Sequence, residues 1–289
     1  MDLGITLYLG DTKKTLGVVY MQWTREATKA IKKVPFFVRK RVKARVEEEA
    51  ARSGAGIVTI EHVRSCQRRF LNKMENEVKG FQIETCFGPT GCPNRAVTSD
   101  GLADELERLL AQKKLMAFLK RVVDGPLKMH HEFRVSISDC PNACSRPQIV
   151  DIGLIGAVKP RVTDLQCTDC GQCVEACKES AIMLGEHGPE IAFEKCLLCG
   201  SCIRACPTGT ISGEKSGYRI LLGGKLGRHP RLGQDVGRIF PIRTISAVVE
   251  LVVDFYKRNC IRGERLGTIL EGQGIKDLIA EMKNRNLLT

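Results

Sequence analysis

Cysteine is the residue type that most clearly indicates chemistry in this chain, since 14 of its 289 residues are cysteine. Residues 167–182 read CTDCGQCVEACKESAI, and residues 196–211 read CLLCGSCIRACPTGTI. Every cysteine of the first stretch aligns with one of the second, so both are copies of the pattern C-x2-C-x2-C-x3-C. In this pattern three closely spaced thiolates bind three irons of one [4Fe-4S] cluster, and the fourth cysteine reaches another cluster. The duplication therefore predicts two [4Fe-4S] clusters and the transfer of single electrons.

The fourth cysteine of each copy is expected to complete the cluster of the other copy. The predicted ligands of one cluster are Cys167, Cys170, Cys173 and Cys206, and those of the second are Cys196, Cys199, Cys202 and Cys177. Structural zinc is the alternative, but zinc sites use paired C-x2-C units rather than two runs of four cysteines. Pro207 follows the last cysteine as in bacterial two-cluster ferredoxins, which this segment resembles over about fifty residues. Lys178 takes the place of that proline in the first copy.

Four further cysteines lie upstream in two short loops, Cys86 and Cys92 in CFGPTGC and Cys140 and Cys144 in CPNAC. Residues 133–138 (FRVSIS) alternate apolar and polar side chains, which predicts a half-buried strand leading into the second loop. Residues 102–123, between the loops, carry leucines at helical spacing and predict one long amphipathic helix. If the loops meet, they form one four-thiolate site. Four thiolates suit zinc or a [4Fe-4S] cluster, and the spacing alone leaves both open.

Composition narrows the class of protein. A hydrophobic content of 43% suffices for one large domain or two to three small ones. We expect no signal peptide and no membrane span, and the clustered cysteines favour metal ligation in the cytoplasm over a disulfide scaffold. The formal net charge is +12, but this count treats every thiol as neutral, whereas metal-bound cysteines are thiolates. A cationic chain also suits an anionic cofactor and small anionic substrates. With only 5% aromatic residues and no basic stretch with stacking aromatics, nucleic-acid binding is disfavoured.

The upstream loops together resemble the signature of the sulfite and nitrite reductases that use sirohaem coupled to a [4Fe-4S] cluster, C-x5-C followed at a distance by C-x3-C. The neighbouring sequence agrees, since three runs resemble strands of that family: residues 134–139, 151–156 and 217–222. Residues 223–230 (GGKLGRHP) resemble its glycine-rich loop. The resemblance covers about residues 78–160 and 213–285. A ferredoxin inserted between these parts makes the chain most similar to the dissimilatory sulfite reductase subunits.

The resemblance implies an α+β fold in which a sulfite-reductase-like half repeat, residues 76–160 and 213–289, carries an inserted ferredoxin domain, residues 161–212. It also implies three [4Fe-4S] clusters and sirohaem, with Cys86, Cys92, Cys140 and Cys144 as ligands of the sirohaem-coupled cluster. By position, Cys144 is the thiolate that bridges this cluster to the sirohaem iron. Family enzymes usually contain two related halves, so the chain is either a compact single-half form or half of a larger site. A two-fold homodimer is the simplest way to complete it.

Sirohaem carries many carboxylates, so the resemblance implies a pocket that is rich in cations. The candidates are Arg95, Arg134, Arg146, Lys159, Lys225, Arg228, His229 and Arg231, and for each the alternative is a solvated surface charge. We assign Arg134 and Lys159 to the anionic substrate. The strand before CPNAC departs from the family, because it holds Glu132, Arg134 and Ser136 in place of a lysine-rich alternation. His130 and His131 precede it and could deliver protons, although an exposed loop is the simpler interpretation.

Residues 23–75 have a different character and predict a small helical domain, preceded by strands in residues 1–22. Pro35 lies in the first turn of one helix, and Thr59 caps a second helix that runs through Cys66. This region resembles the helical domain at the C-terminus of the light-independent protochlorophyllide reductase B subunit. The resemblance implies a docking or helix-packing module near redox tetrapyrrole chemistry, and a plain helical hairpin is the alternative.

Cys66 and Cys260 fall outside every cluster motif and are expected to be packed thiols, which leaves twelve cysteines for three sets of four. The leading hypothesis is a sulfite-reductase-like oxidoreductase in which electrons enter at the ferredoxin, pass to the coupled cluster and reduce sulfite, or else nitrite, at sirohaem. The rival is a non-catalytic electron-transfer subunit that has lost sirohaem, and a third option is reduction of another small or tetrapyrrole substrate. No G-x-G-x-x-G follows a strand, so we expect an electron-donor protein rather than bound nicotinamide or flavin.

Overall fold

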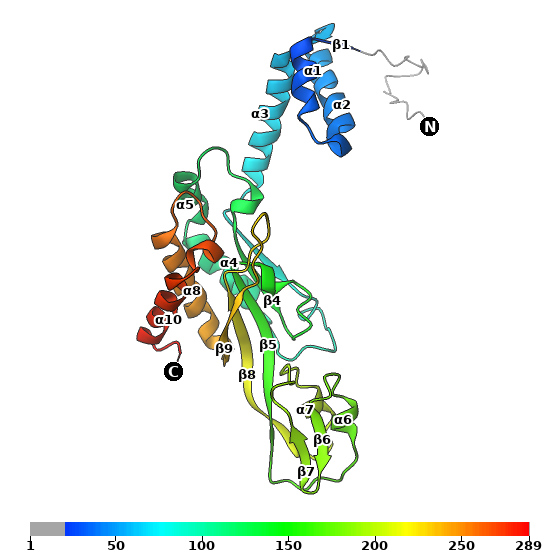
Figure 1. Cartoon of the computed structure of the whole chain (residues 1–289), viewed down its shortest axis with the longest axis vertical. Coiled ribbons are helices and arrows are strands. Elements are labelled where there is room, and N and C mark those ends of the chain that lie inside the picture. Colours follow the sequence, from blue (N-terminus) through cyan, green and yellow to red (C-terminus); the bar gives the residue numbers. More distant parts are fainter. Residues whose placement is uncertain (1–20, 289) are drawn as a thin grey trace, which may run out of the picture. The chain divides into compact units, whose positions relative to one another are not determined.

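The computed structural model describes residues 21–288, apart from the side chains of residues 71–77 (Figure 1). The chain divides after Asn76 into two compact units, and each has a hydrophobic core of its own. Of the strands predicted in residues 1–22, all but the last two residues lie outside the described part of the chain.

The N-terminal unit contains three helices and a short two-stranded parallel sheet. Its elements are β1 (Gln22–Trp23), α1 (Arg25–Lys32), α2 (Phe36–Arg52), β2 (Ile57–Val58) and α3 (Ile60–Glu77). Thr24 caps α1 by accepting a hydrogen bond from the backbone N–H of Ala27. The core consists of small and β-branched side chains, Ala27, Val46, Ala50 and Val58, which allow the helices to pack closely. The two helices predicted here are α2 and α3, and α1 precedes them.

A five-stranded mixed sheet forms the centre of the second unit. Its strands, in spatial order, are β3 (Phe81–Thr85), β4 (Phe133–Ser138), β5 (Ile152–Val162), β8 (Ile211–Leu222) and β9 (Gln234–Phe240). The first three strands run parallel, whereas β8 is antiparallel to both of its neighbours. The strand predicted over residues 133–138 is present as β4, and those predicted near residues 151–156 and 217–222 lie almost wholly within the longer β5 and β8.

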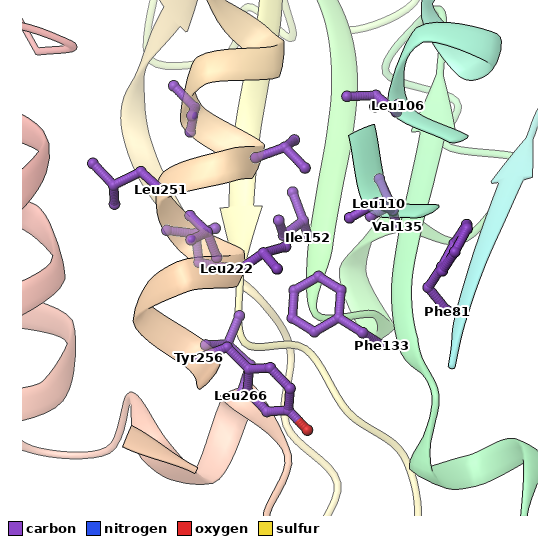
Figure 2. Close-up of a cluster of buried hydrophobic side chains, with 14 of the residues drawn as sticks. Phe81, Leu106, Leu110, Phe133, Val135, Ile152, Leu222, Leu251, Tyr256 and Leu266 are labelled. Carbon is purple, nitrogen blue, oxygen red and sulfur yellow. The ribbon is translucent and has the colours of Figure 1, made fainter. Parts of the chain in front are cut away.

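Helices pack against one face of this sheet (Figure 1). They are α4 (Leu102–Gln112), α5 (Leu115–Val122), α8 (Ile242–Asn259), α9 (Leu266–Ile269) and α10 (Gln273–Asn284). The alternation of apolar and polar side chains along β4 explains why the helices cover this face. Phe133, Val135 and Ile137 all enter the core under the helices and are at most 1% exposed. Figure 2 shows Phe133 beside Tyr256 of α8, with ring centroids 5.1 Å apart. The predicted α+β class is confirmed.

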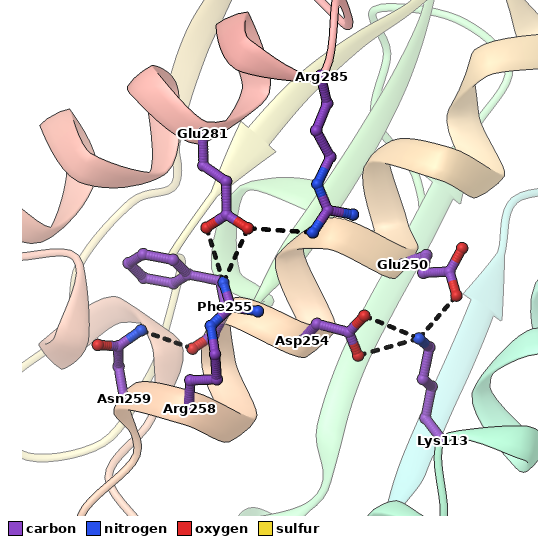
Figure 3. Close-up of polar contacts among 8 residues, drawn as sticks. All are labelled: Lys113, Glu250, Asp254, Phe255, Arg258, Asn259, Glu281 and Arg285. Atoms are coloured by element: carbon purple, nitrogen blue, oxygen red, sulfur yellow. Dashed lines mark hydrogen bonds and ion pairs between the residues drawn. The ribbon is translucent and has the colours of Figure 1, made fainter.

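The single long helix predicted over residues 102–123 is wrong. The structure has two helices there, and Lys114 between them adopts the left-handed region with φ of 52°. A left-handed residue cannot continue a right-handed helix, so α4 ends and α5 begins in a new direction. Lys113 at the break donates to Glu250 at 2.7 Å and to Asp254 at 2.9 Å, both on α8 (Figure 3). The interruption therefore ties α4 to α8.

The longest apolar tract of the sequence, residues 245–256, is broken by Glu250 and Asp254 and therefore predicts an amphipathic helix, which is present as α8. Its last turn is linked to α10, because Arg258 donates to both carboxylate oxygens of Glu281 (Figure 3). Arg285 of the next turn donates to the same carboxylate at 3.2 Å. No helix in the part of the chain that the structure describes is long and apolar enough to cross a membrane.

The cysteine-rich segment extends from the far ends of β5 and β8 (Figure 1). The antiparallel ladder between these strands ends at the pair Val162 and Ile211. Immediately beyond, the backbone N–H of Thr163 donates to the carbonyl oxygen of Thr210 at 2.8 Å. The elements of the segment are α6 (Gln172–Glu175), β6 (Ile182–Gly185), β7 (Gly188–Ile191) and α7 (Ser201–Ala205). The segment thus leaves and re-enters the sheet at neighbouring points.

Candidate functional site

The four upstream cysteines come together at one edge of the sheet. Cys86 directly follows β3, and Cys140 lies two residues after β4. Because β3 and β4 are parallel neighbours, their carboxyl ends lie side by side. The cysteines that line the resulting cavity, of about 40 Å³, are Cys86, Cys92, Cys140 and Cys144. We call it the four-cysteine cavity.

Serine hydroxyls fix the CPNAC loop to β4. Ser145 donates from its hydroxyl to the carbonyl oxygen of Ile137 at 2.8 Å, and Ser136 donates to the carbonyl oxygen of Ser145 at 2.6 Å. All three residues are buried, so these bonds replace lost contacts with water. The polar side of β4 is therefore used to hold the loop that carries two of the cysteines.

The chain turns sharply after this loop. Ala143 and Arg146 both adopt left-handed backbone conformations, with φ of 53° and 59°. They lead into the short 3₁₀ helix η2 (Pro147–Ile149). Gly153 on β5 permits the close approach, because a Cβ atom there would lie 2.0 Å from the carbonyl oxygen of Pro147. The position of the cysteine loop thus depends on a glycine of the neighbouring strand.

N–H groups are directed at the sulfur atoms of the four-cysteine cavity. The backbone N–H groups of Gly88 and Asp139 donate to Sγ of Cys86 at 3.2 and 3.3 Å. The side-chain amide of Asn142 donates to Sγ of Cys144 at 3.3 Å. Hydrogen bonds of this kind orient thiolate ligands and tune the metal centre that they bind.

The cavity as it stands is unfavourable for free thiolates. Burial raises the pKa of the Cys140 thiol, and the neighbouring thiols of Cys144 and Cys86 raise it further, although an N–H from Asn142 has the opposite effect. Gathering four thiolates therefore requires a compensating cationic centre. The donor set fits a bound metal group.

The four cysteines could bind either of the two metal groups that the spacing left open. A zinc ion takes four ligands, with sulfurs at about 2.3 Å from the metal. A [4Fe-4S] cluster binds one thiolate at each of four irons, so its ligands surround a larger volume. Among the described residues, no three Cys, His, Asp or Glu side chains converge on a point where one metal ion would bind all of them.

A second cavity, of about 240 Å³, lies in the cysteine-rich segment. The cysteines of the segment that line it are Cys177, Cys196, Cys199 and Cys202, and we call it the ferredoxin cavity. Burial raises the pKa of Cys202 to about 11, and the thiols of Cys196, Cys199 and Cys177 contribute to the rise. Cys177 belongs to the first copy of the repeat and the other three to the second. The fourth cysteine of one copy thus lies among the cysteines of the other.

The remaining four cysteines of the segment show the reciprocal relationship. Burial raises the pKa of Cys173, and the thiols of Cys167 and Cys206 add to this effect against opposing backbone hydrogen bonds. For Cys206 itself, burial acts to raise the pKa, but hydrogen bonds from Ile211 and Thr208 outweigh it and lower the pKa to about 7. A thiol with this pKa is readily available as a thiolate ligand.

The two cavities share a wall. Asn94, Cys140 and Asn142 line both the four-cysteine cavity and the ferredoxin cavity. Cys140 is buried, whereas the two asparagines are exposed. Metal groups bound in the two cavities would therefore be separated by the side chains of the CPNAC loop and of one neighbouring residue.

Direct contacts hold the cysteine-rich segment against this wall. The backbone N–H of Val158 on β5 donates to the carbonyl oxygen of Leu198 at 2.8 Å. The guanidinium of Arg204 on α7 donates to the carbonyl oxygen of Arg95 at 3.4 Å. The first bond comes from the strand that carries the segment and the second from the loop after Cys92. The segment is thus anchored at two points.

Several predicted cations lie near the sheet face that faces away from the helices, here called the open face. Arg134 lies on this face of β4, and its Nε is a buried donor without a hydrogen-bond partner among the described residues. Arg146 contacts Glu84 at 3.5 Å and is exposed, while Arg95 lines the four-cysteine cavity. A small apolar cluster on the same side consists of Ala143, Ile155 and Leu221. The open face thus combines cations with an apolar patch.

Only part of the cationic set in the glycine-rich loop is available for a ligand. Lys225 donates to the hydroxyl of Thr268 at 2.7 Å, and Arg231 donates to the carbonyl oxygen of Gly267 at 2.7 Å. These bonds tie the loop to α9. The other two predicted cations of this loop, Arg228 and His229, are exposed. Lys225 and Arg231 serve at least in part to shape the loop.

Lys159 lies apart from Arg134, with which the sequence analysis grouped it. Its Nζ pairs with Glu214 at 2.8 Å and lies 5.4 Å from the centre of the Phe193 ring. Glu214 belongs to β8, and Phe193 belongs to the cysteine-rich segment. Neither Lys159 nor Arg134 lines the four-cysteine cavity. The charge of Lys159 is paired with Glu214, whereas Nε of Arg134 has no hydrogen-bond partner among the described residues.

His130 and His131 form the 3₁₀ helix η1 (Met129–His131) ahead of β4, with ring centroids 4.2 Å apart. Burial lowers the pKa of both, and the charges of Lys128 and Arg265 lower it further. The backbone N–H of Lys128 donates to Nδ1 of His131 at 3.1 Å, which requires that nitrogen to be unprotonated. Both rings are thus held in the neutral form at pH 7.

Sequence reasoning missed residues that hold the site together. Asp139, Ser145 and Tyr218 are buried around the cysteine loops, and none of them carries a recognisable motif. The only signal available was the position of Asp139 between a strand and a cysteine, where a charged residue is unexpected in a buried loop.

The sequence matches two family models. The model described as nitrite and sulphite reductase 4Fe-4S domain matches residues 81–287, and the one described as proto-chlorophyllide reductase 57 kD subunit matches residues 23–66. The structure resembles the crystal structure of dissimilatory sulfite reductase I with a TM-score of 0.48 at 16% identity, over 74% of this chain and 56% of that chain.

Two curated relatives are named as sulfite reductases. The chain is 32% identical over 197 residues to the coenzyme F420-dependent sulfite reductase of Methanocaldococcus jannaschii, which is 66% of this chain and 30% of that protein. It is 27% identical over 150 residues to one subunit of the anaerobic sulfite reductase of Salmonella typhimurium, or 47% of this chain and 40% of that protein. The chain thus spans well under half of either relative. Because the first family model covers most of the chain, the protein belongs to the nitrite and sulphite reductase 4Fe-4S domain family.

Proposed function

We propose that this chain is a sulfite-reductase-like oxidoreductase that passes electrons from a two-cluster ferredoxin domain to a sirohaem-coupled [4Fe-4S] centre in the four-cysteine cavity. The observation that carries the proposal is the wall shared by the two cysteine-lined cavities, formed by Asn94, Cys140 and Asn142. A shared wall of side chains gives the short separation that single-electron transfer between clusters requires. The names of both curated relatives support sulfite as the substrate.

The geometry supports an order for the electron transfer. The cluster held by Cys177, Cys196, Cys199 and Cys202 would lie next to the four-cysteine cavity. The cluster held by Cys167, Cys170, Cys173 and Cys206 would then be the outer one, which receives electrons from a donor protein. Three [4Fe-4S] clusters in a row would thus connect the donor to the substrate site.

Sirohaem, when bound, would supply the iron at which the anionic substrate binds and receives electrons. Cys144 is exposed, so its thiolate is available as the predicted bridge. The open face offers the apolar patch of Ala143, Ile155 and Leu221 and the unpartnered Nε of Arg134. A buried donor without a partner is costly, so an anionic group beside Arg134 is the natural complement. We propose Arg134 rather than Lys159 as the residue that binds the substrate or a sirohaem carboxylate.

The open face offers one side of a site, and the chain is either a compact single-half form or completed by a second subunit. We propose that a two-fold homodimer supplies the other side. The N-terminal helical unit would serve as the docking module for a partner, in keeping with its match to a subunit of another reductase.

Purification without oxygen, followed by acid extraction of the pigment and an iron count, tests the proposal. We expect about twelve cluster irons and one sirohaem per chain. Turnover of sulfite and of nitrite with a reduced dye then identifies the substrate. A protein with all of its cluster iron but no sirohaem would contradict the reductase function and favour the non-catalytic electron-transfer subunit. That alternative is supported by the absence of a lysine-rich strand before CPNAC.

A further inference from the structure

A buried carboxylate lies directly beside the four-cysteine cavity. Asp139, between β4 and Cys140, is 1% exposed and contributes to the lining of the cavity. Its side-chain oxygens accept from two neutral hydroxyls, since Ser99 donates to Oδ2 at 2.9 Å and Tyr218 donates to Oδ1 at 3.0 Å. Both oxygens thus accept a hydrogen bond, which is the pattern of a carboxylate anion.

The carboxylate is close to the Cys86 ligand. A Cβ atom on Gly88 would lie 2.2 Å from Oδ2 of Asp139, so the carboxylate packs directly on the backbone of Gly88. The N–H of Gly88 donates to Sγ of Cys86 at 3.2 Å, and the N–H of Asp139 donates to the same sulfur at 3.3 Å. Asp139 therefore contacts this sulfur through its backbone and approaches it with its charge.

Asp139 also connects the two cysteine loops. Its carbonyl oxygen accepts hydrogen bonds from the N–H groups of Ala96 and Val97 at 2.7 and 3.1 Å. These residues follow Cys92, whereas Asp139 precedes Cys140. These bonds fix the backbone of Asp139 relative to the cavity, and the hydrogen bonds from Ser99 and Tyr218 hold its carboxylate.

The Tyr218 hydroxyl remains a donor to this carboxylate. Burial raises the pKa of Tyr218 well above its ordinary value, and the adjacent Asp139 raises it further. Tyr218 is 0% exposed, so water does not compete for its hydroxyl. Together with Ser99, it spreads the charge of Asp139 without neutralising it.

We propose that Asp139 lowers the reduction potential of the [4Fe-4S] cluster in the four-cysteine cavity by placing a fixed negative charge next to it. Reduction adds one electron, and hence one negative charge, to the cluster, and a nearby carboxylate opposes this in a medium of low dielectric constant. The electron comes from the neighbouring ferredoxin cluster. The hydroxyls of Ser99 and Tyr218 moderate the effect. This inference rests on the proposed presence of a cluster at these four cysteines.

The test is a redox titration of the full-length holoprotein, with each cluster followed by its electron paramagnetic resonance signal. The signal of the four-cysteine cluster is assigned by its loss in Cys92→Ser. Asp139→Asn keeps the shape of the side chain and removes its charge. The matched control is Glu132→Gln, because Glu132 is also 1% exposed but lies at the opposite end of β4, where it accepts from the N–H groups of Lys79 and Gly80.

We expect Asp139→Asn to shift the reduction equilibrium of this cluster about tenfold toward the reduced form, or about 59 mV for one electron. Tyr218→Phe removes one donor to the carboxylate and should shift the same potential in the opposite direction. Glu132→Gln should leave it unchanged, and the two ferredoxin clusters should not respond to any of the three. Opposite shifts from two members of one network would not arise from a merely structural role.

An unchanged potential in Asp139→Asn with the cluster retained would overturn the inference. If Asp139→Asn loses the cluster, Tyr218→Phe and Ser99→Ala decide: a lower potential supports the inference, and an unchanged one overturns it. A wild-type protein without iron at these cysteines would instead contradict the proposed function itself. The iron count therefore separates the two failures.

Discussion

The side-chain amide of Asn142 donates a hydrogen bond to Sγ of Cys144 at 3.3 Å, and Asn142 also lines the ferredoxin cavity. One side chain thus contacts the proposed bridging thiolate and faces the proposed electron source. A residue with these contacts should influence both the ligand and the transfer of electrons to it.

Replacing Asn142 by alanine should therefore slow electron transfer between the two cavities. We expect about tenfold lower turnover with a reduced dye, a typical loss when a second-layer partner of a metal ligand is removed. Stopped-flow reduction would show normal rates at the ferredoxin clusters and slow reduction of the four-cysteine centre. Asn259→Ala is a suitable control, because the side-chain amide of Asn259 donates to the carbonyl oxygen of Phe255 in the same helix and does not line either cavity. Equal rates in both variants would contradict the prediction.

Cysteine variants should divide into two classes by their iron content. Cys199→Ser should lose one ferredoxin cluster, about four irons, whereas Cys260→Ser should keep all of its iron. Cys260 is 8% exposed and donates to the carbonyl oxygen of Glu264, as a packed thiol would. Iron and sulfide analysis of both variants beside the wild type provides the measurement. Loss of iron from Cys260→Ser would show that the assignment of the twelve ligands is wrong.

Gly153→Ala should displace the CPNAC loop. The new Cβ would lie 2.0 Å from the carbonyl oxygen of Pro147, so the loop must move, at a cost of about 1–3 kcal/mol in the free energy of unfolding. We also expect loss of the four-cysteine cluster while the ferredoxin clusters remain. Gly56→Ala meets no atom within 4 Å and should change stability by less than about 0.5 kcal/mol. Denaturant titrations of both variants, with optical spectra of the clusters, would test this.

The histidine pair predicts a dependence of stability on pH. Folding lowers the pKa of His130 and His131 below the ordinary value of 6.5, so the unfolded chain binds protons more readily. Their contribution is favourable above pH 6.5 and declines as the pH falls through 6.5 toward the lower folded-state values. Unfolding curves between pH 7.5 and about pH 5 should show a steeper loss in the wild type than in His130→Gln/His131→Gln. Identical slopes of stability against pH in the two proteins would contradict this origin. Acid also acts on the clusters, but this effect is common to both proteins and cancels when their slopes are compared.

Much of the fold follows from local patterns in the sequence. The alternation of Phe133, Val135 and Ile137 with polar residues predicted β4 and its buried face, and the apolar spacing around residues 245–256 predicted α8. The repeated cysteine pattern predicted that Cys177 of the first copy joins cysteines of the second, and these cysteines line one cavity. Such features depend on neighbours along the chain and can be read from it.

Other features depend on contacts that the sequence does not display. The helix break at Lys114 follows from a left-handed residue whose neighbour Lys113 reaches α8, and lysine carries no signal for such a turn. Likewise, Lys159 lies apart from Arg134 because β5 and β8 stay paired beyond the point where β4 ends. The hydrogen bond between Tyr218 and Asp139 joins residues that are 79 positions apart in the chain.

The bond between Thr163 and Thr210, where the cysteine-rich segment leaves and re-enters the ribbon, has an evolutionary consequence. Its two ends are adjacent, so a tight turn between them would restore an uninterrupted β-hairpin. Recombination at this junction could add or remove the whole cysteine-rich segment while leaving β5 and β8 continuous. A chain that lost the segment in this way would keep the five-stranded sheet and its four-cysteine cavity.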